Sequence, residues 1–156
     1  MLKCDPATYG LSMFFSAHLR LPINTILGLQ HGLVFHHHDH AVLRVLVVGV
    51  CVSVDLQTSW TMLTIDDGTG LAVCLQWAAD SHLQTPPSLG ALVTIKARLA
   101  LYNRQTQLVA SHVFVETDPN AELLHWIDCK RLERLYRMPR IVSQKITKPA
   151  SMVRCC

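Results

Sequence analysis

The chain has 156 residues, of which 50% are hydrophobic and only 16% are charged. This length suits one sizeable core and is short for two, and the composition excludes a disordered chain. The net charge of +3, from 14 Lys and Arg against 11 Asp and Glu, excludes a histone-like binder but permits a local basic groove.

The cysteines and the start of the chain bear on the compartment. Six cysteines occur without a CxxC pair, which argues against a zinc ribbon. Asp5 and Pro6 stand where a secretory signal would be apolar, so we expect an intracellular protein with free thiols. The most apolar run, residues 41–54, is interrupted by Arg44 and is short of a membrane span. We therefore expect a soluble protein that does not enter a membrane.

The first 39 residues are expected to hold a short helix and a His-rich connector. Asp5 is a plausible N-cap, Pro6 suits the first helical position, and apolar residues follow over 11–21. Residues 22–39 show no regular period and run into the His-rich segment FHHHDH. We expect the organised barrel to begin only after this connector.

Five strands are predicted between residues 40 and 117. The first, residues 41–56, is dense in Val and Leu and carries Gly49, which suggests a bend or bulge. Residues 59–65 and 71–77 flank the DDGTG turn as a hairpin. Residues 91–102 alternate between a core side and a wet, basic side, and residues 107–116 form the last strand after a short turn.

A helix is predicted over residues 118–138, with Asp118 as N-cap, Pro119 at the first helical position and Pro139 as a stop. Its apolar residues occupy more than one side, which is typical of a helix with two neighbours, here its own barrel and another chain. The tail, residues 139–156, has no period and is expected to be disordered. A long bent strand, a hairpin and a helix after the fifth strand together favour an all-β barrel of the oligonucleotide/oligosaccharide-binding (OB) type, with a sandwich as the rival.

Catalytic chemistry finds little support in the sequence. Asp66 and Asp67 are neighbours in a turn, where we expect their side chains to point to different sides and reach water. The GTG segment lacks the following Lys and precedes a strand, so it is not a phosphate loop. The run HHHDH carries metal-ligand side chains, but in a loop it is more typical of adventitious metal binding. We expect no catalytic residue, no metal and no cofactor, and we interpret the chain as a non-enzyme.

Nucleic-acid binding is better supported, because single-strand binders combine cations that follow phosphates with aromatic planes that stack on bases. The basic strand face carries Lys96 and Arg98 and leads to Tyr102 and Arg104. Trp60 and Trp77 bracket the neighbouring hairpin. Trp77 shares its phase with Leu71, Val73 and Leu75, so the period alone leaves open whether its ring fills the core or faces a base.

These segments together resemble the Stn-type subunit of the CST telomere-maintenance complex, which is related to the middle subunit of replication protein A. The resemblance rests on VGVCVSV, TIDDGTGLAVCLQW, LGALVTIKARLALY, DPNAELLHW and LERLYR, and it runs from about His40 to Met138. The start, LKCDPATYG…LPINTI, is similar to the family's N-terminal helix. DPNAELLHW is the most discriminating piece, because DDGTG…C…W also occurs in other OB folds.

The resemblance implies an OB fold that binds single-stranded DNA within a heterotrimer. It also implies pairing with a small Ten-type OB subunit through the C-terminal helix, a large Ctc-type subunit, and nuclear work in telomere capping with DNA polymerase α-primase. By position, Trp77 and Tyr102 match the family's DNA-facing aromatics, and Asp66, Trp126 and Ile127 match its partner-facing surface. Without winged-helix modules after the barrel, the chain resembles the single-domain form found in plants.

The predicted sites and hypotheses are therefore specific. The DNA-binding residues are expected to be Trp77, Lys96, Arg98, Tyr102 and Arg104. The partner interface is expected to comprise Asp66, Leu124, Trp126, Ile127, Leu132, Leu135 and Tyr136. The first hypothesis is a non-enzymatic subunit of a CST-like complex, the second a general single-strand DNA or RNA binder related to the middle subunit of replication protein A, and the third an enzyme that uses the His-rich loop and a metal.

Overall fold

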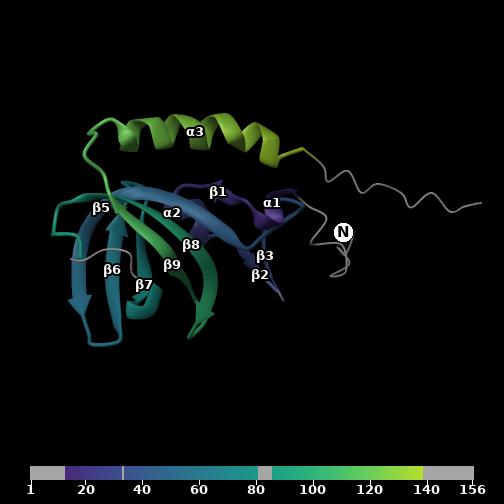
Figure 1. Ribbon diagram of the computed structural model, residues 1–156. Helices are drawn as coiled ribbons and strands as arrows, with labels where there is room; N and C mark the ends of the chain where they lie inside the picture. The colour runs from purple at the N-terminus through teal and green to yellow at the C-terminus, as the bar shows by residue number, and fades with distance from the viewer. Residues whose placement is uncertain (1–12, 33, 81–85, 139–156) are drawn as a thin grey trace, which may run out of the picture.

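The computed structural model describes residues 13–32, 34–80 and 86–138, and its centre is a closed five-stranded barrel (Figure 1). The strands are β5 (Arg44–Leu56), β6 (Trp60–Asp66), β7 (Leu71–Trp77), β8 (Leu92–Tyr102) and β9 (Gln105–Val115). They follow the order β5, β6, β7, β9, β8, and β8 pairs back onto β5 to close the barrel. Only the β7–β9 pair within the barrel is parallel. The predicted OB-type barrel is confirmed.

The long strand β5 closes the barrel because its two halves pair with different strands. Residues 44–50 pair with β8 and residues 50–56 pair with β6, with a register shift between Cys51 and Ser53. Gly49 lies just before this shift. A Cβ at Gly49 would lie 2.6 Å from the carbonyl oxygen of Asp66, so only glycine lets the two strands approach this closely. The predicted irregularity is therefore present, and Gly49 contributes the close approach beside it.

One continuous core fills the barrel and extends beneath the N-terminal segment. Buried apolar side chains line the inside of the barrel; they alternate along β7 and β8, whereas residues 45–48 of β5 are buried consecutively. They include Val45, Val47, Leu63, Ile65, Ala72, Cys74, Val93, Ile95, Ala97, Leu99, Leu108 and Ala110. Leu19, Leu21, Ile23, Ile26 and Leu29 join the same cluster from the N-terminal side. The described chain thus packs as one body.

The N-terminal segment differs from the predicted helix over residues 5–21. Within the described residues, helix α1 covers Met13–Ser16, and β1 (His18–Arg20) then runs parallel to the start of β5. The predicted helix is wrong after Ser16, because the apolar residues there join the barrel sheet. The proposed capping residues, Asp5 and Pro6, lie outside the described residues.

The predicted irregular connector is in fact folded. Helix α2 (Ile23–Leu27) follows Pro22, and β2 (Gln30–His31), β3 (Phe35–His37) and β4 (His40–Val42) form a small antiparallel sheet. The side chain of Asp67 explains the start of α2, since its Oδ2 accepts a hydrogen bond of 2.8 Å from the Ile23 N–H. This cap comes from the β6–β7 turn, so no local sequence period could reveal it.

The last element, α3 (Ala121–Tyr136), lies along the top of the barrel in Figure 1. The helix is confirmed, but it begins later than predicted: Asn120 is the N-cap, and Asp118 accepts the Asn120 N–H in the turn before it. Before it, η2 (Ala78–Asp80) is a single 3-10 turn after β7. None of the helices in the described residues is long and apolar enough to cross a membrane. The predicted stop Pro139 and the tail 139–156 lie outside the described residues.

Candidate nucleic-acid and partner surfaces

The barrel has a free end opposite α3. The β5–β6 connection and the β8–β9 turn both project from the lower edge of the barrel in Figure 1, and β7 ends between them. Residues 57–59 form the first connection and residues 103–104 the second. We call this region the loop end. OB folds bind their ligands with this pair of loops and the strand face between them.

Trp77 lies at the loop end and does not fill the core. The buried residues of β7 are Ala72, Cys74 and Gln76, so the alternate set that includes Trp77 faces outward. The indole of Trp77 is 44% exposed. Trp77 also stands opposite Trp60 in the β6–β7 pairing, which places both side chains on the outer face. The alternative left open by the sequence is decided in favour of an outward ring.

The outer face of β8 carries the other predicted DNA-binding residues. Ile95, Ala97 and Leu99 point into the core, whereas the alternate positions carry Lys96, Arg98 and Tyr102. Tyr102 is 65% exposed, next to a two-residue turn made by Asn103 and Arg104. Both turn residues have positive φ angles, 49° for Asn103 and 63° for Arg104. Tyr102 and Arg104 therefore project at the tip of the hairpin.

The structure brings the five predicted DNA-binding residues only partly together. Strand β9 lies between β7 and β8, so Lys96 and Arg98 are on a different part of the barrel wall from Trp77. Lys96 lies 5.6 Å from the centre of the exposed Phe114 ring, and Arg98 pairs opposite Arg44. Trp77, Tyr102 and Arg104 share the loop end. Lys96 and Arg98 form a basic flank that leads along β8 towards it.

The positive field of this flank acts on a neighbouring histidine, His18. Burial lowers the pKa of His18, and the nearby charges of Arg44, Lys96 and His112 lower it further. A neutral imidazole among cations shows that the flank disfavours additional positive charge. The same field attracts phosphate groups.

The outward side of α3 exposes several large apolar side chains. Leu124, Trp126, Ile127 and Leu135 are exposed, as predicted for a partner surface, and Ile127 reaches 52%. Leu123 and Met138 are also exposed and were missed, although their spacing of four from Ile127 and three from Leu135 was the available signal. We call these six residues the helix face.

Two predicted interface residues belong instead to the chain's own packing. Tyr136 is only 4% exposed, and its ring makes edge contacts with Phe14 and His37. Leu132 is partly buried against the same core. The prediction for Tyr136 is wrong because the small sheet and α1, which the sequence did not reveal, cover that side of the helix.

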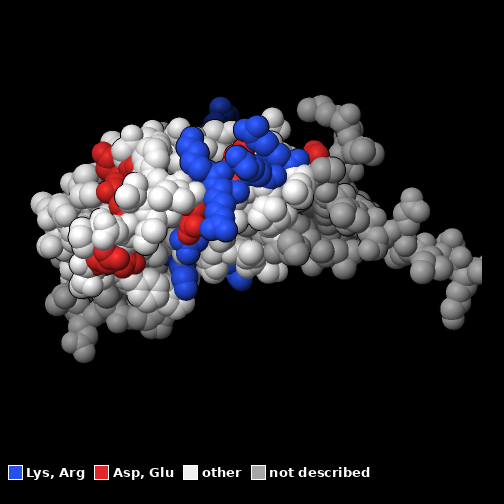
Figure 2. Space-filling model, turned by 90° about the horizontal axis from the view of Figure 1, so that it is seen from above, with Lys and Arg blue, Asp and Glu red and all other residues white. Residues whose placement is uncertain are grey.

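Basic residues are unevenly distributed along α3. All four basic residues of the last two turns and the C-cap, Lys130, Arg131, Arg134 and Arg137, are exposed. Figure 2, which looks down on α3, shows Lys and Arg gathered in a band on this side of the molecule, beside a region that is mostly uncharged and carries acidic patches. The basic residues are therefore concentrated in the second half of α3, where they flank the exposed Leu135.

The DDGTG turn lies beside the helix face. Asp66 Oδ1 accepts a hydrogen bond of 2.8 Å from the Gly68 N–H. A Cβ at Gly68 would lie 3.7 Å from Cζ2 of Trp126, so this turn touches α3 at the tryptophan. Asp66 and Trp126, both predicted to face a partner, thus lie at one edge of the molecule.

Asp67 has a structural role that differs from the expected solvated turn aspartate. Its side chain is 1% exposed, which corrects the expectation that it reaches water. Oδ1 accepts hydrogen bonds from the N–H and the hydroxyl of Thr69, while Oδ2 accepts the Ile23 N–H. A buried carboxylate with three donors is a structural clamp, and none of its oxygens is left for chemistry.

The described thiols are not activated nucleophiles. Burial raises the pKa of Cys74 to about 12 and that of Cys129 to about 12. Both thiols therefore remain protonated near neutral pH, in the form that is a poor nucleophile. The geometry of the described residues supports binding surfaces better than an active site.

Comparison with known proteins gives the family. A family model described as telomere regulation protein Stn1 matches residues 22–151. The chain belongs to the Stn1 family. This confirms the family resemblance seen in the sequence, and the match includes both the barrel and α3.

Individual relatives agree with this assignment. The CST complex subunit STN1 of Arabidopsis thaliana is 31% identical over 117 residues, which cover 61% of this chain and 73% of the relative. The fold is similar to a crystal structure of the S. pombe Stn1-ten1 complex, with a TM-score of 0.72, 17% identity, and coverage of 78% of this chain and 95% of the other. A replication protein A heterotrimer bound to ssDNA gives a TM-score of 0.71 at 16% identity, covering 79% of this chain and all of the matched one. This Stn1-family chain therefore shares its fold with subunits of both assemblies.

Proposed function

We propose that this chain is a single-stranded telomeric DNA-binding subunit of a CST-like complex and acts in telomere capping and replication without catalysing a reaction. Membership of the Stn1 family supports the telomeric setting. The observation that carries the DNA-binding part is the outward, 44% exposed ring of Trp77 between the two projecting loops. A bulky aromatic ring exposed at an OB loop end is suited to stack on an unpaired base.

The proposed DNA path uses both parts of the predicted site. Bases stack on Trp77 and Tyr102 at the loop end, Arg104 holds a phosphate at the hairpin tip, and Lys96 and Arg98 extend the positive field along β8. Base stacking is worth about 1–3 kcal/mol per base by alanine substitution, whereas exposed cations act mainly through salt-dependent phosphate contacts. The two residue groups should therefore respond differently to salt.

Fluorescence anisotropy with labelled single-stranded DNA tests this site in the complex with the partner subunit. Trp77→Ala and Tyr102→Ala are expected to weaken binding by about tenfold or more each, at any salt concentration. The paired variant Lys96→Ala with Arg98→Ala is expected to reduce the slope of log affinity against log salt. Leu89→Ala is the control, because Leu89 is highly exposed but lies outside both groups. Unchanged affinity for Trp77→Ala would remove the proposed stacking site.

We also propose that a small Ten-type OB subunit binds the helix face. The helix face, with five exposed apolar residues on α3 and Met138 just after its end, is an exposed apolar surface of the kind that marks a protein–protein contact. Leu132 supports the helix from below, and Asp66 adds an acceptor at the Trp126 edge. The basic second half of α3 favours an acidic region on the partner.

Co-expression and gel filtration test this interface. Ile127→Glu places a charge in the middle of the helix face and is expected to abolish co-purification with the Ten-type subunit, because a buried unpaired charge is strongly unfavourable. Leu89→Glu is the matched control, since Leu89 is an exposed apolar residue that does not belong to the helix face. Equal co-purification of both variants would place the partner elsewhere.

The wider assembly follows from the family. A large Ctc-type subunit, contact with DNA polymerase α-primase and a nuclear, telomeric location are proposed on the same basis. The second candidate function is general single-strand DNA or RNA binding, which the likeness to the replication protein A fold favours. Competition among telomeric repeat DNA, a mixed-sequence strand and RNA of equal length distinguishes the two functions. A preference for the repeat supports telomeric DNA binding, and equal binding of all three supports general single-strand binding.

A further inference from the structure

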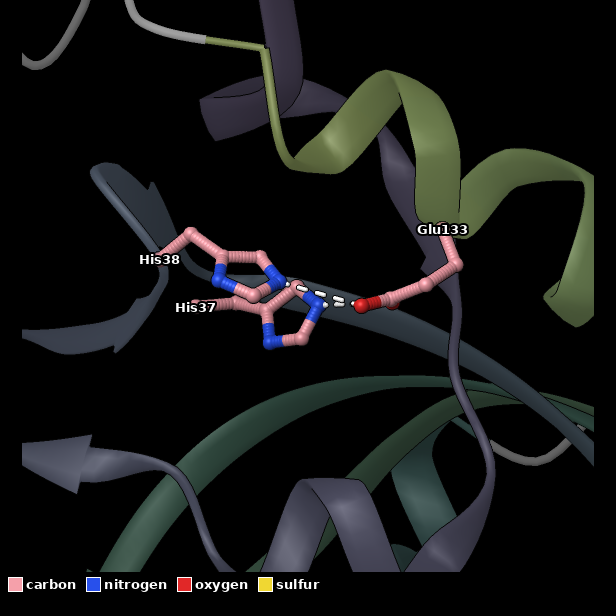
Figure 3. A group of neighbouring side chains, drawn as sticks. All are labelled: His37, His38 and Glu133. Atoms are coloured by element: carbon pink, nitrogen blue, oxygen red, sulfur yellow. Dashed lines mark hydrogen bonds and ion pairs between the residues drawn. The ribbon is translucent and has the colours of Figure 1, made fainter.

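The His-rich run folds against α3. His37 ends β3, His38 and Asp39 form the turn, and His40 begins β4, so the histidines sit on a tight hairpin. His38 has a positive φ of 52°, which turns its side chain out of the strand pattern. Figure 3 shows the rings of His37 and His38 side by side, both directed at the carboxylate of Glu133 on α3. Residues almost a hundred positions apart thus converge.

The distances among these three groups are short. His37 Nε2 lies 3.2 Å from Glu133 Oε2, and His38 Nε2 lies 3.1 Å from Glu133 Oε1. One ligand atom from each of the three residues lies within 4.8 Å of the other two. Ligands of a tetrahedral Zn²⁺ at bond lengths of about 2.0–2.1 Å are roughly 3.3 Å apart. Each imidazole already lies at about that spacing from one carboxylate oxygen of Glu133, and the three groups need only draw closer together around an ion.

We propose that His37, His38 and Glu133 form a binding site for a divalent transition-metal ion of the Zn²⁺ class. Two imidazoles and a carboxylate are a ligand set that suits Zn²⁺, Co²⁺ or Ni²⁺ and does not suit Ca²⁺, which takes six or more oxygens. Water completes the coordination. The side chain of His38 is 39% exposed, so solvent reaches the site.

The protonation states favour this ligand set. Burial lowers the pKa of His37, so its ring is neutral near pH 7. Partial burial raises the pKa of Glu133, but hydrogen bonds from His38, Arg137 and His37 outweigh it and leave the pKa below its ordinary value. A metal ion on Nε2 of the neutral His37 ring requires the tautomer that carries its proton on Nδ1.

Arg137 competes with the metal for the carboxylate. Its Nε donates a hydrogen bond of 3.0 Å to Glu133 Oε1, the same oxygen that His38 contacts. The Arg137 side chain is 69% exposed, so it can leave the site at little cost. A bound cation would repel this guanidinium. Removal of Arg137 is therefore expected to tighten metal binding, which distinguishes a metal site from a simple salt-bridge cluster.

The consequence of metal binding is a clamp between the hairpin and α3. His40 already contributes one link, because its Nε2 lies 2.9 Å from the Met138 carbonyl oxygen at the end of the helix. A metal on Glu133 adds a second link one turn earlier. The end of α3 is thereby held against the body of the chain, and the fold gains stability with the logarithm of the ratio of free metal concentration to Kd.

Titration of the full chain with Co²⁺ alone tests the site, using protein purified without a His-tag and washed with chelator. One Co²⁺ per chain with the visible absorption of tetrahedral coordination is expected, displaced by Zn²⁺. Glu133→Gln and His38→Ala are expected to weaken binding by at least about tenfold, and Arg137→Gln to strengthen it. The controls are His36→Ala, in the same run but outside the trio, and Glu122→Gln, on the same helix.

The same variants separate the proposed site from chelation by the histidine run itself. Adventitious binding to residues 36–40 does not need Glu133, so Co²⁺ affinity unchanged in Glu133→Gln would overturn the proposal. Equal losses in His36→Ala and His38→Ala would overturn it too. Thermal unfolding gives a second readout: Zn²⁺ is expected to raise the melting temperature of the unmodified chain and of His36→Ala but not of Glu133→Gln, and an equal rise in all three would contradict the clamp.

Discussion

Trp77 stands directly opposite Trp60 across the antiparallel pair of β7 and β6, and both indoles project from the outer face of the barrel. Directly opposed residues in such a pair share one face, so the exposure of Trp77 fixes the side of Trp60 as well. The pair ends the two strands at the loop end, away from α3. An aromatic surface of this kind is available to a ligand rather than to the core.

The tip of the β8–β9 hairpin stores backbone strain at a proposed contact residue. Arg104 adopts a φ of 63°, which costs a residue with a side chain about 1 kcal/mol or more relative to glycine. Arg104→Gly is expected to raise the free energy of unfolding by about 1 kcal/mol and to weaken DNA binding. Asn103→Gly relieves similar strain without removing a charge, so it should leave DNA affinity nearly unchanged. Urea denaturation and anisotropy measure the two effects, and a loss of stability in Arg104→Gly would contradict the strained turn.

The neighbouring aspartates of the DDGTG turn are expected to differ sharply on substitution. Asp67→Asn loses an acceptor for the Ile23 N–H or for Thr69 in a buried site, which costs about 1–3 kcal/mol. Asp66→Asn keeps an acceptor for its single, more exposed bond to the Gly68 N–H and should change stability by less than about 0.5 kcal/mol. Urea denaturation of both variants checks this difference. Equal effects would mean that Asp67 does not clamp α2.

The close approach of β5 to β6 gives a test of the barrel itself. Gly49→Ala forces a methyl group against the carbonyl of Asp66 and should destabilise the fold by about 1–3 kcal/mol. Gly32→Ala is the control, because the nearest atom to its added Cβ is 4.0 Å away. Thermal and urea unfolding of the two variants measure the difference. A Gly49→Ala protein as stable as the control would be inconsistent with this strand geometry.

Stability is expected to fall as the pH is lowered through the histidine range. Burial lowers the pKa of His125 from its ordinary value of 6.5; Arg20 lowers it further, while Asp67 and Asp128 oppose the shift. Below pH 6.5 the unfolded chain binds a proton that folded His125 resists, so the stability present above 6.5 is progressively lost. Urea denaturation at about pH 7.5 and about pH 5.5 should show this loss, and a smaller loss in His125→Gln. If His125→Gln and the exposed-site control His31→Gln keep the same pH slope, His125 is not responsible.

Much of the fold could be predicted because its signals are local. The alternation along β8 and the cluster of turn residues at DDGTG depend only on neighbouring residues, and both appear in the structure as expected. The small sheet and α2 could not be predicted, because Ile23 and its neighbours are ordered by Asp67, 44 residues later. The prediction of where the N-terminal helix ends failed for the same reason, because β1 forms only by pairing with β5.

The candidate sites also divide into features with a local sequence signal and features set by contacts between distant residues. The period placed Trp77 with Leu71 and Val73, but only the closed barrel decides which side of β7 is inside. Tyr136 fits an apolar stripe on α3, yet its neighbours come from α1 and β3, which were not foreseen. His37 and His38 meet Glu133 only because α3 lies across the small sheet. The presence of histidines and a glutamate in the sequence does not indicate that these side chains meet.

Tryptophan fluorescence measures the central claim most directly, because stacking on a base quenches an indole. The chain has three tryptophans, and a version with Trp60→Phe and Trp126→Phe keeps only Trp77. In complex with the partner, titrated with single-stranded DNA, this version should be strongly quenched as DNA binds. A version that also carries Trp77→Phe corrects for the partner's own signal and should bind more weakly. DNA binding of normal affinity without quenching of Trp77 would contradict the proposed function of the loop end.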